Sequence, residues 1–186
     1  MKNLGVFFFL FSFLLTFNGF SQSQKKVFRY LSSQEKWGYV FQNGDFLVKP
    51  QFDYGGDFFE ERARVKLNNK WGYLDLSGKL AIPLMFDFAG EFSEGLAFVK
   101  VKGKYGYINK NGTMVVPPQF EEAGNFNNGL AFIRVQKKFG FINLKGKVVI
   151  PPQFELVGDF FENLCWFKEK NHYGYINLLG QMIYPP

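Results

Sequence analysis

The stretch Lys104-Tyr105-Gly106-Tyr107-Ile108 decides the fold, because the chain contains a version of it five times. The other copies begin at Lys36, Lys70, Lys138 and His172, so that consecutive copies are 34 residues apart. Equal intervals without an insertion or a deletion indicate a tandem repeat, in which each unit is one supersecondary element that packs on its neighbours. The chain therefore has to be interpreted unit by unit.

The third unit predicts three antiparallel strands, over residues 96–101, 104–108 and 114–116. Side chains of the first strand alternate between two faces, and a two-residue connection of the hairpin type leads to the second. An Asx residue and a glycine three places later then mark a type I turn closed by a left-handed residue. The third strand is expected to end at Pro117-Pro118, because proline removes a donor from the ladder.

A connector leads from each unit to the next, from Gln119 to Phe126 in the third unit, and it repeats a column of Phe and a column of Gly. No stretch shows sustained helical periodicity. We therefore predict an all-β fold of tandem three-stranded antiparallel meanders, arranged as an open, curved, solenoid-like array. A five-bladed, propeller-like closed array is the alternative, since a connector that forms an inner strand would complete a four-stranded blade.

The first residues differ from the repeats. Lys2 is followed by an almost entirely apolar stretch over residues 4–17, which is shorter than a bilayer-spanning helix. This pattern is typical of a cleavable secretory signal, so we expect a signal peptide over residues 1–23 and a five-unit repeat domain over residues 24–186. A retained anchor is the alternative. The expected location is the periplasm, the cell surface or the exterior, without a transmembrane segment after signal cleavage.

The charge limits the classes of partner. The chain has 22 Lys and Arg against 16 Asp and Glu, a net charge of +6. Much of the positive charge recurs once per unit instead of forming one dense patch. Together with the expected export, this argues against nucleic acid as a partner. An anionic polysaccharide of the envelope is compatible with the charge.

The sequence contains no catalytic constellation. Its one histidine, His172, replaces a lysine of the repeat, and it has no Gly-rich phosphate loop or nucleophile elbow. Its one cysteine, Cys165, replaces an alanine of the other units, which predicts a small buried side chain and excludes an intrachain disulfide. We therefore expect no enzyme activity, no catalytic residue, no cofactor and no metal. Acidic columns recur in every unit, which favours bonds to turn amides over calcium binding.

The repeated motif resembles the WG-repeat family of bacterial proteins, named for the Trp-Gly pair in Lys-Trp-Gly-Tyr. The Asn-x-x-Gly-Lys and Ile-Pro-Pro-Gln-Phe elements are also similar to that family, and the resemblance covers residues 28–186. It implies no particular chemistry. We expect the ring of each motif to lie in the core between units, with the glycine admitting a neighbouring ring or backbone. These structural motif residues are Trp37, Gly38, Trp71, Gly72, Tyr105, Gly106, Phe139, Gly140, Tyr173 and Gly174.

One face of the first strand of each unit is a candidate ligand face. It carries a ring or an arginine in successive units, and a cation two places further along the same face. The residues are Tyr30, Arg64, Phe98, Phe132 and Trp166, with Lys66, Lys100, Arg134 and Lys168. A ladder of rings edged by cations suits a polymer or a peptide. In the alternative, the rings pack between units and the cations cap them.

These observations favour an exported repeat scaffold that mediates protein–protein interaction. The alternative is a cell-wall or glycan-binding module that uses the ladder of rings and cations. Solvent-exposed rings at Phe98, Phe132 and Trp166 would favour glycan binding. Buried rings at these positions, with an apolar patch elsewhere, would favour a protein partner. The identity of either partner is not encoded in a recognisable motif.

Overall fold

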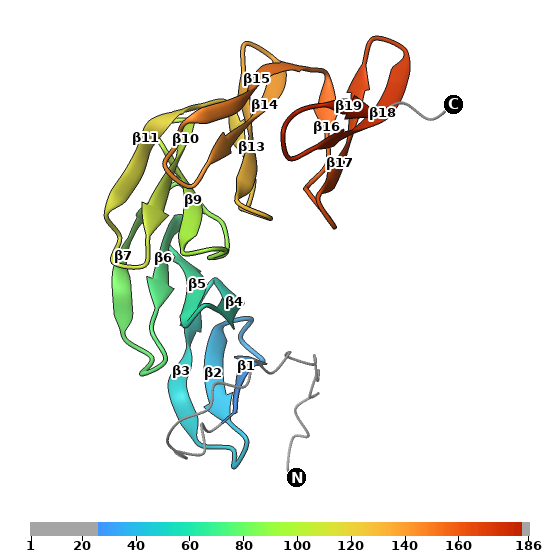
Figure 1. The fold of residues 1–186 in the computed structure, drawn as a ribbon. Coiled ribbons are helices and arrows are strands. Elements are labelled where there is room, and N and C mark those ends of the chain that lie inside the picture. Colours follow the sequence, from blue (N-terminus) through green and yellow to red (C-terminus); the bar gives the residue numbers. More distant parts are fainter. Residues whose placement is uncertain (1–25, 184–186) are drawn as a thin grey trace.

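The computed structural model describes residues 26–183, and all of its regular elements are β-strands. Five antiparallel sheets follow one another along an open arc, with the first and the fifth at opposite ends (Figure 1). The prediction of an all-β, open and curved array is confirmed, and the closed alternative is wrong. Within the described residues no helix could span a membrane. The expected signal peptide lies outside the described residues.

Each sheet is an up-and-down meander in chain order. The first has three strands and each of the others has four. The first sheet consists of β1 (Val27–Leu31), β2 (Trp37–Phe41) and β3 (Phe46–Phe52); the second of β4 (Tyr54–Phe59), β5 (Arg62–Leu67), β6 (Lys70–Leu74) and β7 (Leu80–Phe86); the third of β8 (Phe88–Ala89), β9 (Leu96–Val101), β10 (Lys104–Asn109) and β11 (Met114–Phe120); the fourth of β12 (Glu122–Ala123), β13 (Leu130–Val135), β14 (Lys138–Asn143) and β15 (Val148–Phe154); the fifth of β16 (Leu156–Val157), β17 (Leu164–Glu169), β18 (His172–Asn177) and β19 (Met182–Ile183).

The connector supplies the strand that the sequence did not predict. In units two to five it forms β4, β8, β12 and β16, and each of these pairs with the long strand that follows it. Three of the four have only two residues, which is too short for a visible alternation of faces. The arc nevertheless stays open, so four strands per unit do not by themselves close a propeller.

In units one to four the glycine of the motif lies opposite a bulge in the third strand of its own unit. In the third unit, Tyr105 pairs with Phe120 and Tyr107 pairs with Val116, so β11 has extra residues at the place of its two prolines. A Cβ on Gly106 would lie 2.4 Å from the carbonyl oxygen of Val116. The third strand therefore does not end at the prolines as expected. It passes them in a bulge, where no ladder donor is required, and only glycine leaves room for that backbone.

The turn between the second and third strands is confirmed as an Asx turn. In the third unit the side-chain oxygen of Asn109 accepts hydrogen bonds from the backbone N–H groups of Asn111 and Thr113, each at 3.0 Å. Gly112 has a φ of 79°, the left-handed conformation that the sequence predicts for this place. The turn therefore holds the second and third strands of the third unit in register.

The hydrophobic core is divided into four clusters, one at each junction of two units. We call the side of a sheet that meets the following unit its front face, and the side that meets the preceding unit its back face. At the junction of units three and four, the front face contributes Tyr107, Val116 and Phe120, and the back face contributes Ala131 and Ile133. Each of the first four units therefore buries its front face through contact with the next unit.

Candidate functional site

The candidate ligand face belongs to the front faces of the units. Phe98 and Phe132 are half-buried, and each packs against the cluster at the junction with the next unit. Each ring also lies directly on a connector glycine, since a Cβ on Gly90 or Gly124 would be 2.3 Å from a ring carbon of Phe98 or Phe132. The two rings are therefore held inside the array and do not line an open groove.

The cations of this face lie over the motif rings of their own units. The distances from the charged group to the ring centroid are 6.0 Å for Lys66 over Trp71, 5.1 Å for Lys100 over Tyr105, 5.4 Å for Arg134 over Phe139 and 5.9 Å for Lys168 over Tyr173. Arg134 also forms an ion pair with Glu122, and Lys168 lies 3.9 Å from a carboxylate oxygen of Glu155. The cations of this face therefore cap the motif rings, which is the alternative that the sequence left open.

In the first unit the structure places Arg29, and not Tyr30, in this column. Arg29 pairs with Tyr39 as Arg64 pairs with Tyr73. The two arginines make equivalent contacts: Arg29 donates to the carbonyl oxygen of Gly55 and forms an ion pair with Asp57, and Arg64 donates to that of Ala89 and forms an ion pair with Glu91. Spacing by whole repeats misplaced Tyr30, because the turn after β1 is one residue longer than expected and shifts the register.

Tyr30 lies on the opposite side of the first sheet. Its ring packs edge-on against Phe46, with 5.5 Å between the ring centroids. It is half-buried there. Its position on the back face of the first unit removes it from the candidate ligand face.

The acidic columns hold the turns, as the sequence predicts. Asp53 and Asp87 accept hydrogen bonds of 2.9 Å from backbone N–H groups of the following hairpin turn, and each also accepts one of 2.7 Å from a lysine, Lys36 or Lys70. The hydrogen bond from the lysine lowers the pKa of each aspartate below its usual 3.8. Residues 26–183 contain no group of three His, Cys, Asp or Glu side chains that could hold a metal ion.

Cys165 is buried on the back face of the fifth unit, as its place in the alanine column predicts. Burial raises the pKa of its thiol to about 12. A thiol with such a pKa is protonated at neutral pH and is a poor nucleophile. His172, the only histidine, is exposed at the start of β18.

The front face of the fifth unit is the exception in the array, because it is exposed. Tyr175 is 49% exposed, whereas its counterparts Tyr73 and Tyr107 are 0% exposed. Tyr173 is 61% exposed, whereas its counterpart Trp71 is 9% exposed. The sequence gives no sign of this difference, because the residue types in these columns barely change between units.

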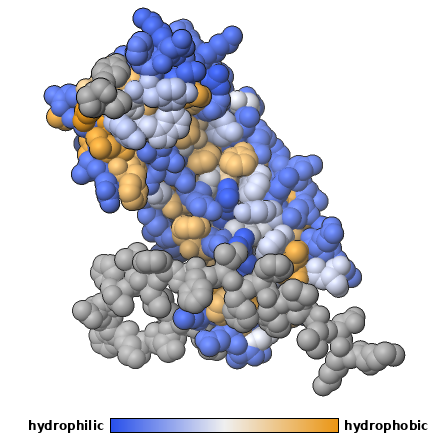
Figure 2. All heavy atoms as spheres, turned by 90° about the vertical axis from the view of Figure 1, so that its right-hand side faces the viewer, coloured by the Kyte–Doolittle hydropathy of each residue, from blue (hydrophilic) through white to orange (hydrophobic). Residues whose placement is uncertain are grey.

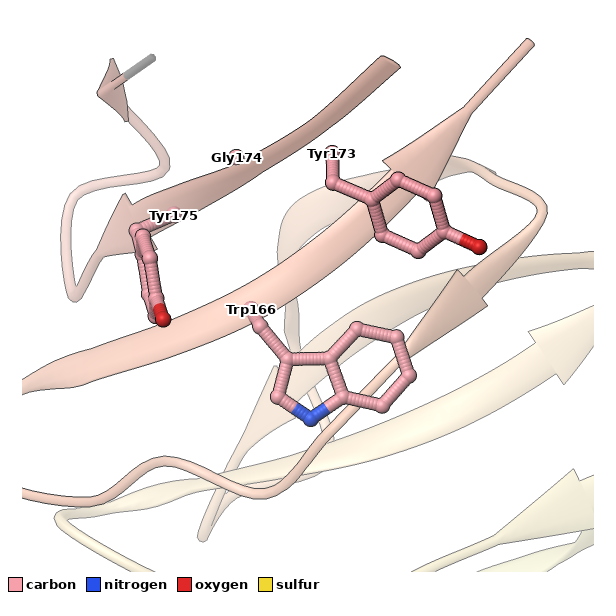
Figure 3. A pocket seen from close by; sticks show the side chains of 4 residues that line it. All are labelled: Trp166, Tyr173, Gly174 and Tyr175. Carbon is pink, nitrogen blue, oxygen red and sulfur yellow. The ribbon is translucent and has the colours of Figure 1, made fainter. Parts of the chain in front are cut away.

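The exposed rings line a pocket. Trp166, Tyr173, Gly174 and Tyr175 surround an open space of about 540 Å³, and the three rings project from the same side of β17 and β18 (Figure 3). Trp166 and Tyr175 are directly paired across the two strands. The rings combine large apolar surfaces with an indole N–H and two phenol hydroxyls, a combination that suits a partially polar ligand surface.

A second aromatic feature was missed by the sequence reasoning. In the first three units, rings of the motif alternate with rings of the connector: Trp37, Tyr54, Trp71, Phe88 and Tyr105. Neighbouring centroids in this series are 5.2 to 6.5 Å apart. Tyr54 and Phe88 stand 34 residues apart, which is the signal that could have identified them. This series ends where Glu122 takes the place of a ring.

Comparison with known proteins supports the repeat. The family model "WG containing repeat" matches residues 37–71, 71–105, 105–139 and 139–171. Among solved structures, that of a eukaryotic initiation factor is similar to this chain, with a TM-score of 0.54 and 13% sequence identity. The similarity covers 87% of this chain and 52% of that chain. The extracellular domain of the putative hybrid two component system BT3049 from B. thetaiotaomicron gives a TM-score of 0.44 and 15% identity, over 89% of this chain and 27% of that one.

At 13% identity, the first similarity shows the fold alone. The chain spans about half of the first structure and about a quarter of the second. No curated protein matches the sequence.

Proposed function

Because the chain belongs to the family of WG-containing repeat proteins, we propose that it is an exported repeat scaffold that binds a protein partner and catalyses no reaction. The observation that carries this proposal is the uncovered front face of the fifth unit. Tandem repeats offer modular surfaces that need no cofactor. The proposed location, the periplasm or the cell surface, rests on the signal-like composition of residues 1–23.

The fifth unit exposes several apolar side chains. Nine of them are large: Leu156, Phe161, Leu164, Trp166, Tyr173, Tyr175, Leu179, Met182 and Ile183. Figure 2 shows apolar patches among polar residues on the side toward which the arc opens. Three of the nine side chains, Trp166, Tyr173 and Tyr175, lie together around one pocket, and clustered apolar side chains of this kind are typical of protein interfaces.

The composition of the face favours a protein partner. Trp and Tyr are the residues that most often dominate the free energy of protein–protein binding. The opposite side of the same sheet packs Cys165, Phe167 and Ile176 against the fourth unit. The exposed rings therefore stand on a supported sheet, which reduces the entropy lost on binding.

The glycan-binding alternative has weaker support. It requires a ladder of open rings along the array, and Phe98 and Phe132 are half-buried at the junctions of units. Of the three rings at issue, Trp166 alone is exposed, at 42%. A polysaccharide would thus meet one ring platform at the end of the array and no extended groove.

A binding experiment with a matched control tests the proposal. The experiment uses residues 24–186, the chain expected after signal cleavage, which we call the mature chain. The mature chain, a Tyr173→Ser/Tyr175→Ser variant and a Phe59→Ala control would be immobilised and offered envelope extract and purified cell-wall polysaccharide separately. Phe59 is also exposed, but it lies on β4 in the second unit. We expect a discrete protein to be retained by the mature chain and by the control, and to be lost with the double variant.

Two results would contradict the proposal. Retention of polysaccharide without any protein would make the chain a glycan-binding module. Equal retention of a protein by the double variant would show that the front face of the fifth unit is not the binding surface. The variants would first be compared with the mature chain by thermal unfolding, so that loss of binding is not loss of the fold.

A further inference from the structure

Two contacts recur at the junctions between units, a hydrogen bond at three of the four junctions and a ring pair at all four. In the first three units the phenol of the motif donates a hydrogen bond to a connector carbonyl: Tyr39 to Gly56 at 2.7 Å, Tyr73 to Gly90 at 2.7 Å and Tyr107 to Gly124 at 2.9 Å. Phe141 takes this place in the fourth unit and has no hydroxyl. A buried phenol and a buried carbonyl thus satisfy each other.

The second contact is a ring two residues after that connector glycine. The centroid of this ring lies 5.4 Å from Tyr39 for Phe58, 4.9 Å from Tyr73 for Phe92, 5.0 Å from Tyr107 for Phe126 and 5.0 Å from Phe141 for Phe160. These are edge-on or tilted pairs, the geometry that aromatic rings prefer. A connector with Gly-x-Phe is therefore the element that covers a front face.

Tyr175 has neither contact. Within residues 26–183 its hydroxyl makes no hydrogen bond and its ring makes no aromatic pair, and the side chain is half exposed. Toward the preceding strand its backbone is equivalent to that of Tyr107, because Tyr175 pairs with Trp166 as Tyr107 pairs with Phe98. Toward the following strand it pairs with Ile183 without the bulge that β11 forms opposite β10. The face thus has the donor and the ring of the standard junction without the matching connector.

We propose that the front face of the fifth unit binds a connector-like segment of a partner protein. This segment has the spacing of Phe120, Gly124 and Phe126: an aromatic residue, a glycine four residues later and a phenylalanine two residues after the glycine. A β-meander follows the segment. This inference rests on the proposed function and names its partner by chemistry. The glycine carbonyl would accept the hydrogen bond from Tyr175, and the ring would pack against its phenol. Trp166 and Tyr173 would flank the segment on the same side of the sheet.

An intact second copy of the chain is excluded as the source of this segment. Its own connectors are already inside junctions, with Phe92, Phe126 and Phe160 buried and Gly56, Gly90 and Gly124 buried as well. Releasing one of them would open a core cluster, at the cost of several buried aromatic contacts. The proposed partner segment is therefore a connector that is not already part of a junction.

The chain supplies its own probe for this site. A fluorescent peptide with the sequence of residues 117–130, which contains Gly124 and Phe126, would be titrated with the mature chain while its anisotropy is followed. The control peptide carries Phe126→Ala. We expect saturable binding of the first peptide, and affinity that falls about ten-fold or more with the control peptide or with a Tyr175→Ala chain, as for loss of an interface hot spot.

A covered chain provides the second control. Repeating residues 153–186 directly after Pro186 keeps the spacing of 34 residues and places a sixth unit over the face. This extended chain is expected not to bind the peptide. Binding that is equal in the mature, Tyr175→Ala and extended chains, or absent at millimolar peptide, overturns the inference. In the binding experiment above, a protein could be retained through Tyr173 and Tyr175 and yet not be displaced by the peptide. That result would support the scaffold function and would contradict the proposal of a connector-like partner segment.

Discussion

The phenol of Tyr107 donates a hydrogen bond of 2.9 Å to the carbonyl oxygen of Gly124, 17 residues further along the chain and in the next unit. Burial raises the pKa of this phenol, so it keeps its proton at every physiological pH. The bond joins the front face of the third unit to the connector that covers it. It therefore links the repeat motif of the sequence to the stacking of the units.

Replacing Tyr107 by Phe removes this bond and leaves the carbonyl of Gly124 without its partner. We expect the free energy of unfolding to fall by about 1 kcal/mol, the usual net value for such a bond. Urea denaturation of the mature chain measures the change. Tyr175→Phe is the matched control, because Tyr175 is exposed and its hydroxyl makes no hydrogen bond within the described residues. Equal losses in the two variants would contradict the account.

Gly106→Ala is expected to destabilise the third unit by roughly 1–3 kcal/mol or more, since overpacking forces the backbone to shift. The new Cβ would lie 2.4 Å from the carbonyl oxygen of Val116 and 2.7 Å from the nitrogen of Pro118. The equivalent change in the fifth unit, Gly174→Ala, meets its nearest atom at 3.0 Å and should cost less. The two unfolding curves in urea give the comparison. A larger loss at Gly174 would disprove the role of the bulge.

The pair of Lys70 and Asp87 predicts a small dependence of stability on pH. The hydrogen bond from Lys70 lowers the pKa of Asp87 in the folded chain below 3.8. A carboxylate with a lower pKa in the folded state stabilises the fold above the unfolded pKa, and this contribution is lost as the pH falls through the folded pKa. Asp87→Asn should therefore lower the melting temperature more at pH 7 than at pH 2.5. Both side chains are exposed, so the effect is modest. An equal loss at both pH values would refute the assignment.

Cys165 should be unreactive in the folded chain. The thiol is buried and its pKa is raised to about 12, so little thiolate is present at pH 8. Iodoacetamide is expected to modify it only after unfolding, as mass spectrometry would show. Cys165→Ala should fold and bind as the mature chain does, because Ala63, Ala97 and Ala131 occupy the same column. Rapid modification of the folded chain would be inconsistent with this placement.

The repeat, the strands and the turns were predictable, because each depends on residues close in the sequence. The 34-residue spacing identified the units, and Asn109 with Gly112 identified the turn between the second and third strands. The short connector strands were missed, because a two-residue strand is formed by pairing and has no pattern of its own. The bulge at Pro117-Pro118 was missed for a similar reason, since it depends on the partner strand.

The candidate site was less predictable, because it depends on register and on neighbours. Tyr30 was assigned to the ligand face by whole-repeat spacing, and one extra turn residue moved Arg29 into its place. Phe98, Phe132 and Trp166 share a column, yet a following unit packs over the first two. Whether one of these rings is buried or exposed thus depends on the unit that packs over it. The residues next to the ring in the sequence do not contain that information.

Hydroxyl-radical footprinting of the dilute mature chain tests the central claim most directly. The claim is that Trp166 and Tyr175 lie on an uncovered copy of a face that is buried elsewhere in the array. Mass spectrometry would compare their oxidation rates with those of the buried counterparts Tyr73 and Tyr107. The account predicts that Trp166 and Tyr175 are oxidised many times faster than Tyr73 and Tyr107. Oxidation of Tyr175 as slow as that of Tyr107 would mean that the front face of the fifth unit is already covered, and would contradict the account.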